Sequence, residues 1–332
     1  MALKVFLPSA NGDYTELNRG FLDKPLLAVT GKGGVGKSAV AAALALRHAR
    51  AGRRTLLFGV DSIQPLLRFF ECPTESSQQV DVLPNLRCIN LDRQLLLDEF
   101  IREKIGLKLV SDRIIQNPVY KYFSAVAPGI RELLALARIH QAVTAGWPGG
   151  TPWERVIIDA PATGHGVRFF AVPRIAINTF RVGPLKANSL RIKELLEDPR
   201  QTAFCLVTLA EEMPVSETLE LYDHLVNQMA MRVEAVLVNA VYPVAASAVV
   251  DPDPAGAEPA GDPLYTRLLE AARFAQMRRE MNERYINVLA QRIAVPLREI
   301  PYLADEQFGL AALDQLLAAI FDSPTPSSGV RG

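Results

Sequence analysis

The sequence predicts an α/β fold built around a doubly wound, mainly parallel sheet. Short apolar runs alternate with amphipathic stretches along most of the 332 residues. A glycine-rich loop separates the first such run from the first such stretch. Apolar residues make up 49% of the chain and charged residues 22%, a balance typical of globular proteins. Alternating strands and helices produce βαβ crossovers, and these crossovers make neighbouring strands parallel.

The elements follow one another as strand, helix and strand from the start of the predicted core. An apolar run over 25–30 predicts the first strand, the pattern over 38–51 predicts a helix, and 55–60 predicts a second strand. Further strand-like runs occupy 86–91, 155–159, 203–209, 233–238 and 297–300. Helical patterns separate most of these runs, which supports a parallel sheet with helices on its faces.

A long interval over 92–147 contains no strand-like run and divides the predicted core. It is long for a single crossover, and its apolar residues recur at helical spacing. Those residues are Leu95, Leu96, Phe100, Ile130, Leu133, Leu134 and Ala137. We therefore predict a helical subdomain here, inserted in the sheet, which could serve to bind a partner.

This insertion separates a first part of the core, over 25–91, from a second part over 148–322. Residues 244–263 are rich in proline, alanine and glycine and predict a flexible linker. Residues 323–332 predict a polar tail.

The charges balance, because lysine and arginine total 36 and aspartate and glutamate also total 36. No overall positive field exists, so we expect no nucleic-acid partner and at most peripheral membrane contact. The first residues lack the apolar length of a signal peptide, and no uncharged apolar run reaches the roughly 18 residues of a membrane span. These features predict a cytoplasmic protein.

Three cysteines, Cys72, Cys88 and Cys205, lie far apart and form no Cys-x-x-Cys pair. This spacing predicts a reducing compartment and no zinc site. Cys88 and Cys205 lie in strand-like runs and are expected to be small buried residues, whereas Cys72 is expected in a loop.

The glycine-rich loop reads Gly-Lys-Gly-Gly-Val-Gly-Lys-Ser and matches the P-loop pattern G-x4-G-K-[ST]. In such a loop, backbone N–H groups and the following helix N-terminus wrap phosphates. The pattern predicts ATP and Mg²⁺ as ligands, with Lys37 on the β- and γ-phosphate oxygens and Ser38 on the metal. The predicted nucleotide-binding residues of the loop are Gly31, Lys32, Gly33, Gly34, Val35, Gly36, Lys37 and Ser38.

Two aspartates, Asp61 and Asp159, come at the carboxyl ends of predicted strands. Open α/β sheets bind ligands in the crevice outside these strand ends. A single aspartate at such a position is more often a helix cap or a turn residue. Two of them beside one P-loop favour a functional site.

The second lysine of the loop, Lys32, makes it resemble the deviant Walker A loop. That loop is found in septum-site and partition ATPases, nitrogenase iron protein, and the arsenite-pump and tail-anchored-protein-targeting ATPases. In this family the extra lysine reaches the ATP of the partner subunit, so the resemblance implies a face-to-face dimer and a catalytic role for Lys32 and Lys37. Homodimer and heterodimer with a paralogue both remain open, and the alternative for Lys32 is a solvated loop residue.

The segment Asp-Ala-Pro-Ala-Thr-Gly-His that begins at Asp159 resembles the switch of the arsenite-pump and tail-anchored-targeting branch. Weaker likenesses follow in the same order, so the resemblance runs from about residue 25 to residue 320. It implies that Asp61 orients the attacking water and that Asp159 holds Mg²⁺ through water. It also implies adenine recognition and a γ-phosphate switch. The adenine residues are Asn239 and Pro301, and the switch residues are Asp159, Thr163, Gly164 and His165.

The sequence departs from the family pattern at several points. The first switch reads Asp-Ser-Ile-Gln from Asp61, where the family has Asp-Pro-Ala-His. The zinc-binding Cys-x-x-Cys pair is missing, and arsenite binding is not expected from these cysteines. None of the six methionines lies between 92 and 145, and Met277 and Met281 are expected in the core.

The leading hypothesis is a dimeric ATPase that hydrolyses MgATP. In this hypothesis a nucleotide-driven switch rearranges the helical subdomain to bind, target or release an unidentified client, for which a hydrophobic membrane-protein segment is one candidate. The alternative is a nucleotide-binding scaffold or a positioning ATPase with no hydrophobic client, for which a heterodimer is one option. An iron-sulfur protein is disfavoured, because two suitably placed cysteines are lacking.

Overall fold

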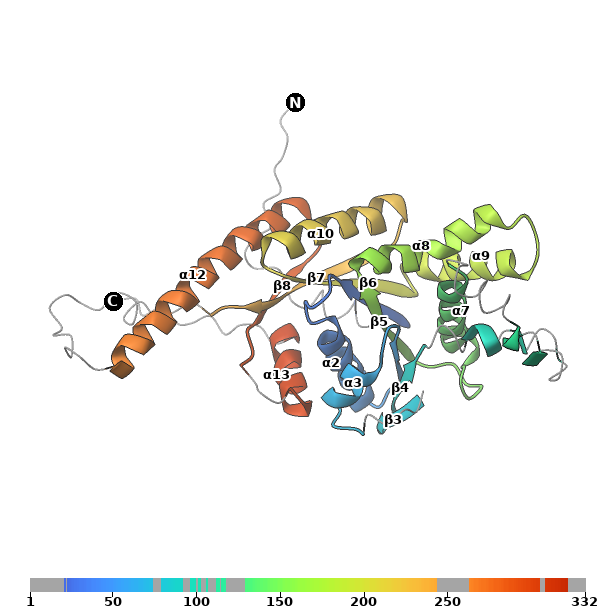
Figure 1. Cartoon of the computed structure of the whole chain (residues 1–332), viewed down its shortest axis with the longest axis horizontal. Coiled ribbons are helices and arrows are strands. Elements are labelled where there is room, and N and C mark those ends of the chain that lie inside the picture. Colours follow the sequence, from blue (N-terminus) through green and yellow to red (C-terminus); the bar gives the residue numbers. More distant parts are fainter. Residues whose placement is uncertain are drawn as a thin grey trace, which may run out of the picture.

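An eight-stranded sheet forms the centre of the protein in a computed structural model (Figure 1). The strand order is β3-β4-β2-β5-β1-β6-β7-β8, and every neighbouring pair is parallel except β3 and β4. The strands are β1 (Leu26–Gly31), β2 (Thr55–Gly59), β3 (Gln79–Leu83), β4 (Leu86–Asn90), β5 (Arg155–Ala162), β6 (Thr202–Leu209), β7 (Val233–Val241) and β8 (Leu297–Pro301). The predicted α/β fold with a mainly parallel sheet is confirmed.

The structure describes the sheet and most of the helices that cover it. The described residues are 21, 23–73, 79–91, 96–99, 101–102, 106, 112–113, 115–117, 129–243, 263–304 and 308–321, without the side chains of 162–166. The predicted linker, apart from residue 263, and the predicted tail lie outside these residues, as does most of 92–128.

Helices cover both faces of the sheet (Figure 1). One face carries α2 (Lys37–Arg50), α3 (Gln64–Phe69) and α13 (Leu310–Phe321). The other carries α7 (Ile130–Ala145), α8 (Thr163–Thr179), α9 (Pro184–Glu197), α10 (Glu212–Asp223), the π-helix η2 (His224–Gln228) and α12 (Pro263–Arg292). Successive strand residues enter opposite cores: Leu26 and Ala28 pack in one, Leu27 and Val29 in the other. This double coverage explains why the central strands read as continuous apolar runs.

One strand, β3, was not predicted from the sequence. It pairs antiparallel with β4 at the edge of the sheet, with Gln79 opposite Ile89. Only Val82 of its five residues is buried, so it lacks the apolar run that identifies the central strands. A second difference concerns β5, which continues past Asp159 to Ala162 because it pairs further with β1.

The helix α7 lies within the predicted helical insertion. Its apolar face is buried through Leu133, Leu136 and Ile139, and the backbone N–H of Gly129 donates to the Glu132 carboxylate at 3.1 Å. The buried residues of α7 share one core with α8, α9 and the sheet. The existence of a separate helical subdomain stays a prediction.

The helix α12 is 30 residues long and is mostly exposed. Only Asn282 and Leu289 are buried, and the helix projects beyond the sheet (Figure 1). Met277 is 58% exposed, so its predicted place in the core is wrong; Met281 is half-buried. Met277 and Met281 are four residues apart, which puts them on one face of the helix. This spacing does not show whether another part of the protein covers that face. Among the described residues, no helix combines the length and apolarity needed to cross a bilayer.

Candidate functional site

The P-loop joins β1 to α2, and two of its glycines lie against neighbouring chain segments. A Cβ atom at Gly31 would collide with the carbonyl oxygen of Val207 in β6. Gly36 has φ 95°, and a Cβ there would collide with the side-chain nitrogen of Asn239. Both positions therefore require glycine. The helix α2 begins at Lys37, so its N-terminal N–H groups lie at the end of the loop and favour a bound anion.

Ser38 and Asp159 form the polar centre of the site. The Ser38 hydroxyl donates a hydrogen bond of 2.6 Å to Asp159 Oδ2. The other carboxylate oxygen, Oδ1, is buried and has no hydrogen-bond partner among the described residues. The pKa of Asp159 is raised to about 6, chiefly by burial and in smaller part by the charge of Asp61, while the Ser38 hydrogen bond and Lys37 oppose the rise. A carboxylate oxygen without a hydrogen-bond partner, next to a hydroxyl, can supply some of the ligands of Mg²⁺. This ion is usually bound by one or two protein carboxylates together with substrate phosphates and water.

The Lys37 side chain is buried beside this pair. Its ammonium group donates to the backbone carbonyl of Lys32 at 2.7 Å. Burial lowers the pKa of Lys37, while the charges of Asp159 and Asp61 raise it. The ammonium therefore lies against the backbone of the P-loop, where loops of this type bind phosphate.

Asp61 comes directly after Val60, two residues past the end of β2, and is exposed. Its charge raises the pKa of both Lys37 and Asp159, so the three groups share one electrostatic environment. The structure therefore brings together the P-loop after β1, Asp61 after β2 and Asp159 in the second half of β5, on the side of the sheet where open α/β sheets bind ligands.

The second P-loop lysine, Lys32, contacts the helix α10. Its ammonium group lies 2.9 Å from the carboxylate of Glu217 in α10, and both side chains are about 30% exposed. Sequence reasoning assigned no role to Glu217. The pairing depends on how α10 packs, which no sequence motif predicts.

Asn239 lies in β7 and Pro301 ends β8. The Asn239 side-chain amide donates to the backbone carbonyl of Val35 at 2.9 Å, which fixes β7 to the P-loop. Beyond Asn239 the rings of Tyr242 and Tyr302 are stacked, with centroids 5.3 Å apart. This pair was not predicted, because the two tyrosines lie 60 positions apart in the sequence and meet only through the pairing of β7 with β8.

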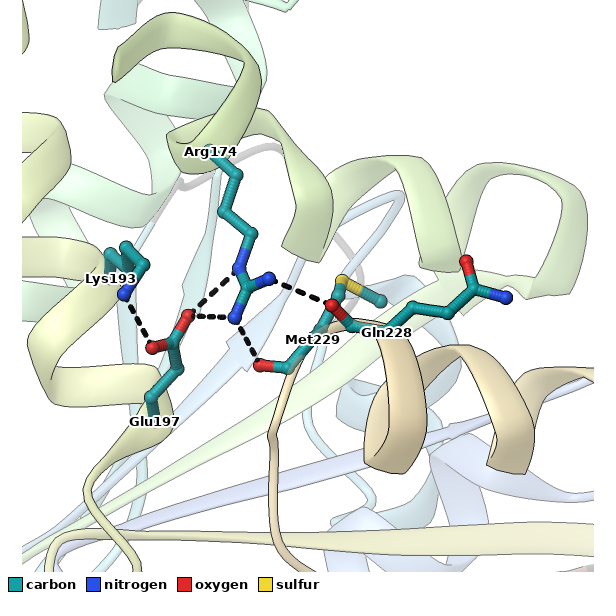
Figure 2. Close-up of polar contacts among 5 residues, drawn as sticks. All are labelled: Arg174, Lys193, Glu197, Gln228 and Met229. Carbon is teal, nitrogen blue, oxygen red and sulfur yellow. Dashed lines mark hydrogen bonds and ion pairs between the residues drawn. The ribbon is translucent and has the colours of Figure 1, made fainter. Parts of the chain in front are cut away.

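The predicted switch residues Thr163, Gly164 and His165 open α8, and their side chains lie outside the described residues. Further along α8, Arg174 binds two neighbouring segments (Figure 2). It donates to the Glu197 carboxylate of α9 at 2.6 and 2.8 Å and to the backbone carbonyls of Gln228 and Met229 at 2.7 Å. Arg174 thus joins the helix that begins at the predicted switch to α9 and to the end of η2.

The cysteines occupy the environments expected from the sequence. Cys88 and Cys205 are fully buried in strands, and burial raises the pKa of both thiols. Cys72 is half-buried and follows α3. In the part of the chain that the structure describes, no three His, Cys, Asp or Glu side chains gather in a way that could hold a metal ion.

The sequence is similar to one known family over most of its length. The family model described as anion-transporting ATPase matches residues 25–183 and 181–250. ATPase BagA of Mycobacterium tuberculosis is 32% identical over 217 residues, which cover 64% of this chain and 63% of that protein. A putative arsenical pump-driving ATPase of Halobacterium salinarum is 24% identical over 310 residues, or 89% of this chain and 44% of that protein.

A third relative, ATPase GET3 of Kluyveromyces lactis, is 27% identical over 247 residues, or 64% of this chain and 70% of that protein. These relatives are named as ATPases. The match spans slightly less than two thirds of the length of the mycobacterial proteins.

Proposed function

The chain belongs to the anion-transporting ATPase family, and from this membership and the geometry of the P-loop we propose that it hydrolyses MgATP. The proposal rests on one observation: Asp159 Oδ1 is buried next to the Ser38 hydroxyl and has no hydrogen-bond partner among the described residues. It lies next to a buried lysine and a helix N-terminus, so negative phosphates and a hard cation have complementary groups within one site.

Each residue of the site has a separate task in this proposal. The P-loop N–H groups and Lys37 bind the phosphate oxygens, while Ser38 and Asp159 hold the metal. Bound Mg²⁺ supplies neutralising charge to the phosphate oxygens. Asp61 is exposed at the same end of the sheet and orients the water that attacks the γ-phosphorus atom. The bond between this atom and the bridging oxygen of ADP breaks as the new bond forms, and ADP leaves. Positioning and charge neutralisation are the main requirements of phosphoryl transfer.

We propose further that the active form is a dimer. Lys32 is bound to Glu217 within one chain, and this partly exposed pair can exchange for the phosphates of the nucleotide bound to a partner subunit. A homodimer satisfies this role, and a heterodimer with a paralogue is the alternative. The switch at the start of α8 would then move the helical layer that contains α7, and this layer would bind, target or release a protein client.

The contacts of Arg174 support a connection between the switch and this layer. Because Arg174 joins α8 to α9 and to the end of η2, a displacement of α8 is transmitted to the helices around it. A hydrophobic membrane-protein segment remains the candidate client, and a nucleotide-binding scaffold without a client remains the alternative function.

Phosphate release by the purified chain tests the enzymatic part of the proposal. We expect Mg²⁺-dependent release of phosphate from ATP, and we expect Lys37→Ala to abolish it by weakening nucleotide binding. Binding of MgATP without any phosphate release would contradict hydrolysis and favour the scaffold alternative.

The client can be identified with an Asp61→Asn variant held in the ATP-bound state. Affinity capture with this form, followed by identification of proteins that are absent from the Lys37→Ala capture, isolates nucleotide-dependent partners. A set of captured proteins that is the same for both variants would count against a nucleotide-driven client cycle.

A further inference from the structure

The pair of helices α8 and α9 carries an excess of positive charge. Between the start of α8 and residue 193 the sequence contains six basic residues and no aspartate or glutamate. The basic residues are Arg168, Arg174, Arg181, Lys186, Arg191 and Lys193. Over the whole chain the charges balance. This stretch therefore creates a local positive region on a protein that has no overall positive field.

Two of the six basic residues are bound to one carboxylate of α9. Glu197 accepts hydrogen bonds from Arg174 at 2.6 and 2.8 Å and from Lys193 at 2.6 Å (Figure 2). The other four pair with no carboxylate in the part of the chain that the structure describes. Because the apolar faces of α8 and α9 also pack in one core, the two helices form a fixed support for these four cations.

The hairpin tip, which we define as residues 175–191, combines three of the cations with exposed aliphatic side chains. Val182 lies between the two helices and is 85% exposed, while Ile175 and Leu190 are 58% and 41% exposed. All three lie within roughly two helical turns of the connection between α8 and α9. This connection lies at the edge of the molecule (Figure 1). The cations of the tip are Arg181, Lys186 and Arg191.

The combination of cations and aliphatic side chains distinguishes between partners. A single exposed aliphatic residue is common on protein surfaces and needs no partner. A nucleic acid would pair with the cations but would leave the aliphatic side chains against phosphates and water. A protein partner would need a pocket that encloses the tip, whereas a bilayer needs no matching shape. An anionic bilayer pairs its headgroups with the cations and accepts the aliphatic side chains at the boundary of the acyl chains.

From this arrangement we propose that the hairpin tip docks the protein on an anionic lipid surface. Arg181, Lys186 and Arg191 pair with phosphate headgroups, and Val182 enters the boundary between headgroups and acyl chains. The contact is peripheral, because no helix of the described residues could cross a bilayer. It requires neither nucleotide nor hydrolysis, and it therefore goes beyond the proposed function.

The test is co-sedimentation of the full chain with lipid vesicles. One set of vesicles contains equal parts of phosphatidylglycerol and phosphatidylcholine, and the other contains phosphatidylcholine alone. We expect the wild type to bind the anionic vesicles far better than the neutral ones, and added salt to weaken this binding. Arg181→Ala and Val182→Ser should each lower the partition coefficient roughly fivefold, or about 1 kcal/mol. The controls Arg267→Ala and Leu268→Ser change exposed residues of α12 and should bind as the wild type does.

A second measurement reports whether the tip enters the bilayer. Val182→Trp places an indole at the tip, and we expect anionic vesicles to shift its emission to shorter wavelength; Leu268→Trp on α12 should show no such shift. Equal binding of the wild type to both kinds of vesicle, or an equal loss in the α12 controls, overturns the proposal.

Absence of vesicle binding by the wild type also overturns the proposal, whether or not the tip then binds duplex DNA or an acidic protein. The substituted residues lie outside the nucleotide site. Phosphate release from ATP by the same proteins therefore tests the proposed function separately.

Discussion

Replacing Asp159 with asparagine tests the account of the buried carboxylate in the nucleotide-free protein. Asparagine has nearly the same shape and no charge, and its oxygen can still accept the Ser38 hydroxyl. The wild-type side chain is 8% exposed, and burial is the main cause that raises its pKa from 3.8 to about 6. The variant should therefore be more stable than the wild type, because the buried charge is removed. It should also lose Mg²⁺-dependent nucleotide binding, because a carboxylate proposed to hold the metal is gone.

The size of the gain follows from the pKa shift. A shift of one unit corresponds to about 1.4 kcal/mol, so a pKa raised from 3.8 to about 6 corresponds to a gain of about 3 kcal/mol. The raised pKa means that the folded wild type binds more protons than the unfolded chain between about pH 4 and pH 6. Over this window its free energy of unfolding falls as the pH rises, and above pH 6 this contribution is constant.

Urea unfolding of both proteins, without nucleotide or Mg²⁺, measures this difference at pH 5 and pH 7.5. We expect a gain of about 3 kcal/mol for Asp159→Asn at pH 7.5 and a clearly smaller gain at pH 5. Asp314→Asn is the control, because this exposed carboxylate pairs with Arg50 at the surface and should change stability by no more than about 1 kcal/mol. A variant of Asp159 that is less stable than the wild type at pH 7.5, or a gain that does not vary with pH, would refute the reasoning.

Three further predictions concern the dimer, the metal and the helical layer. Lys32→Ala should lower the nucleotide-dependent mass increase seen by light scattering, with little change in monomer stability, because its pair with Glu217 is partly exposed; an unchanged mass increase would make Lys32 a solvated loop residue. Metal analysis should find no stoichiometric zinc, since the cysteines offer no suitable pair; one zinc per dimer would contradict this. Hydrogen exchange in α7 should differ between the ADP and ATP-analogue states; identical exchange, with no protection by a hydrophobic helix, would remove the client model.

The central strands and the P-loop could be predicted because their signals are local. A strand buried on both faces requires an uninterrupted apolar run, and a phosphate-binding loop requires glycines at fixed spacing. Gly31 and Gly36 illustrate the second requirement, since any side chain there would collide with β6 or with Asn239. Asp61 was predicted just after a strand, where the structure places it, whereas Asp159 lies within β5 because this strand continues to Ala162.

The features that the sequence missed depend on contacts between distant segments. The edge strand β3 has one face open to solvent and therefore lacks a continuous apolar run. Met277 has the spacing of a core residue, but the helix that carries it extends beyond the sheet. The pairs Lys32–Glu217 and Tyr242–Tyr302 join residues that no sequence motif connects. Such contacts become visible only when the helices and strands are placed together.

The measurement that tests the central claim most directly is single-turnover hydrolysis of MgATP by Asp61→Asn, paired with equilibrium binding of the same nucleotide. Asp61 is exposed beside the buried site, so its replacement should leave binding near the wild-type value. We expect the rate of phosphate formation to fall by orders of magnitude, whereas Lys37→Ala should lose binding itself. Near-normal hydrolysis by Asp61→Asn would contradict the assignment of Asp61 as the residue that orients the attacking water.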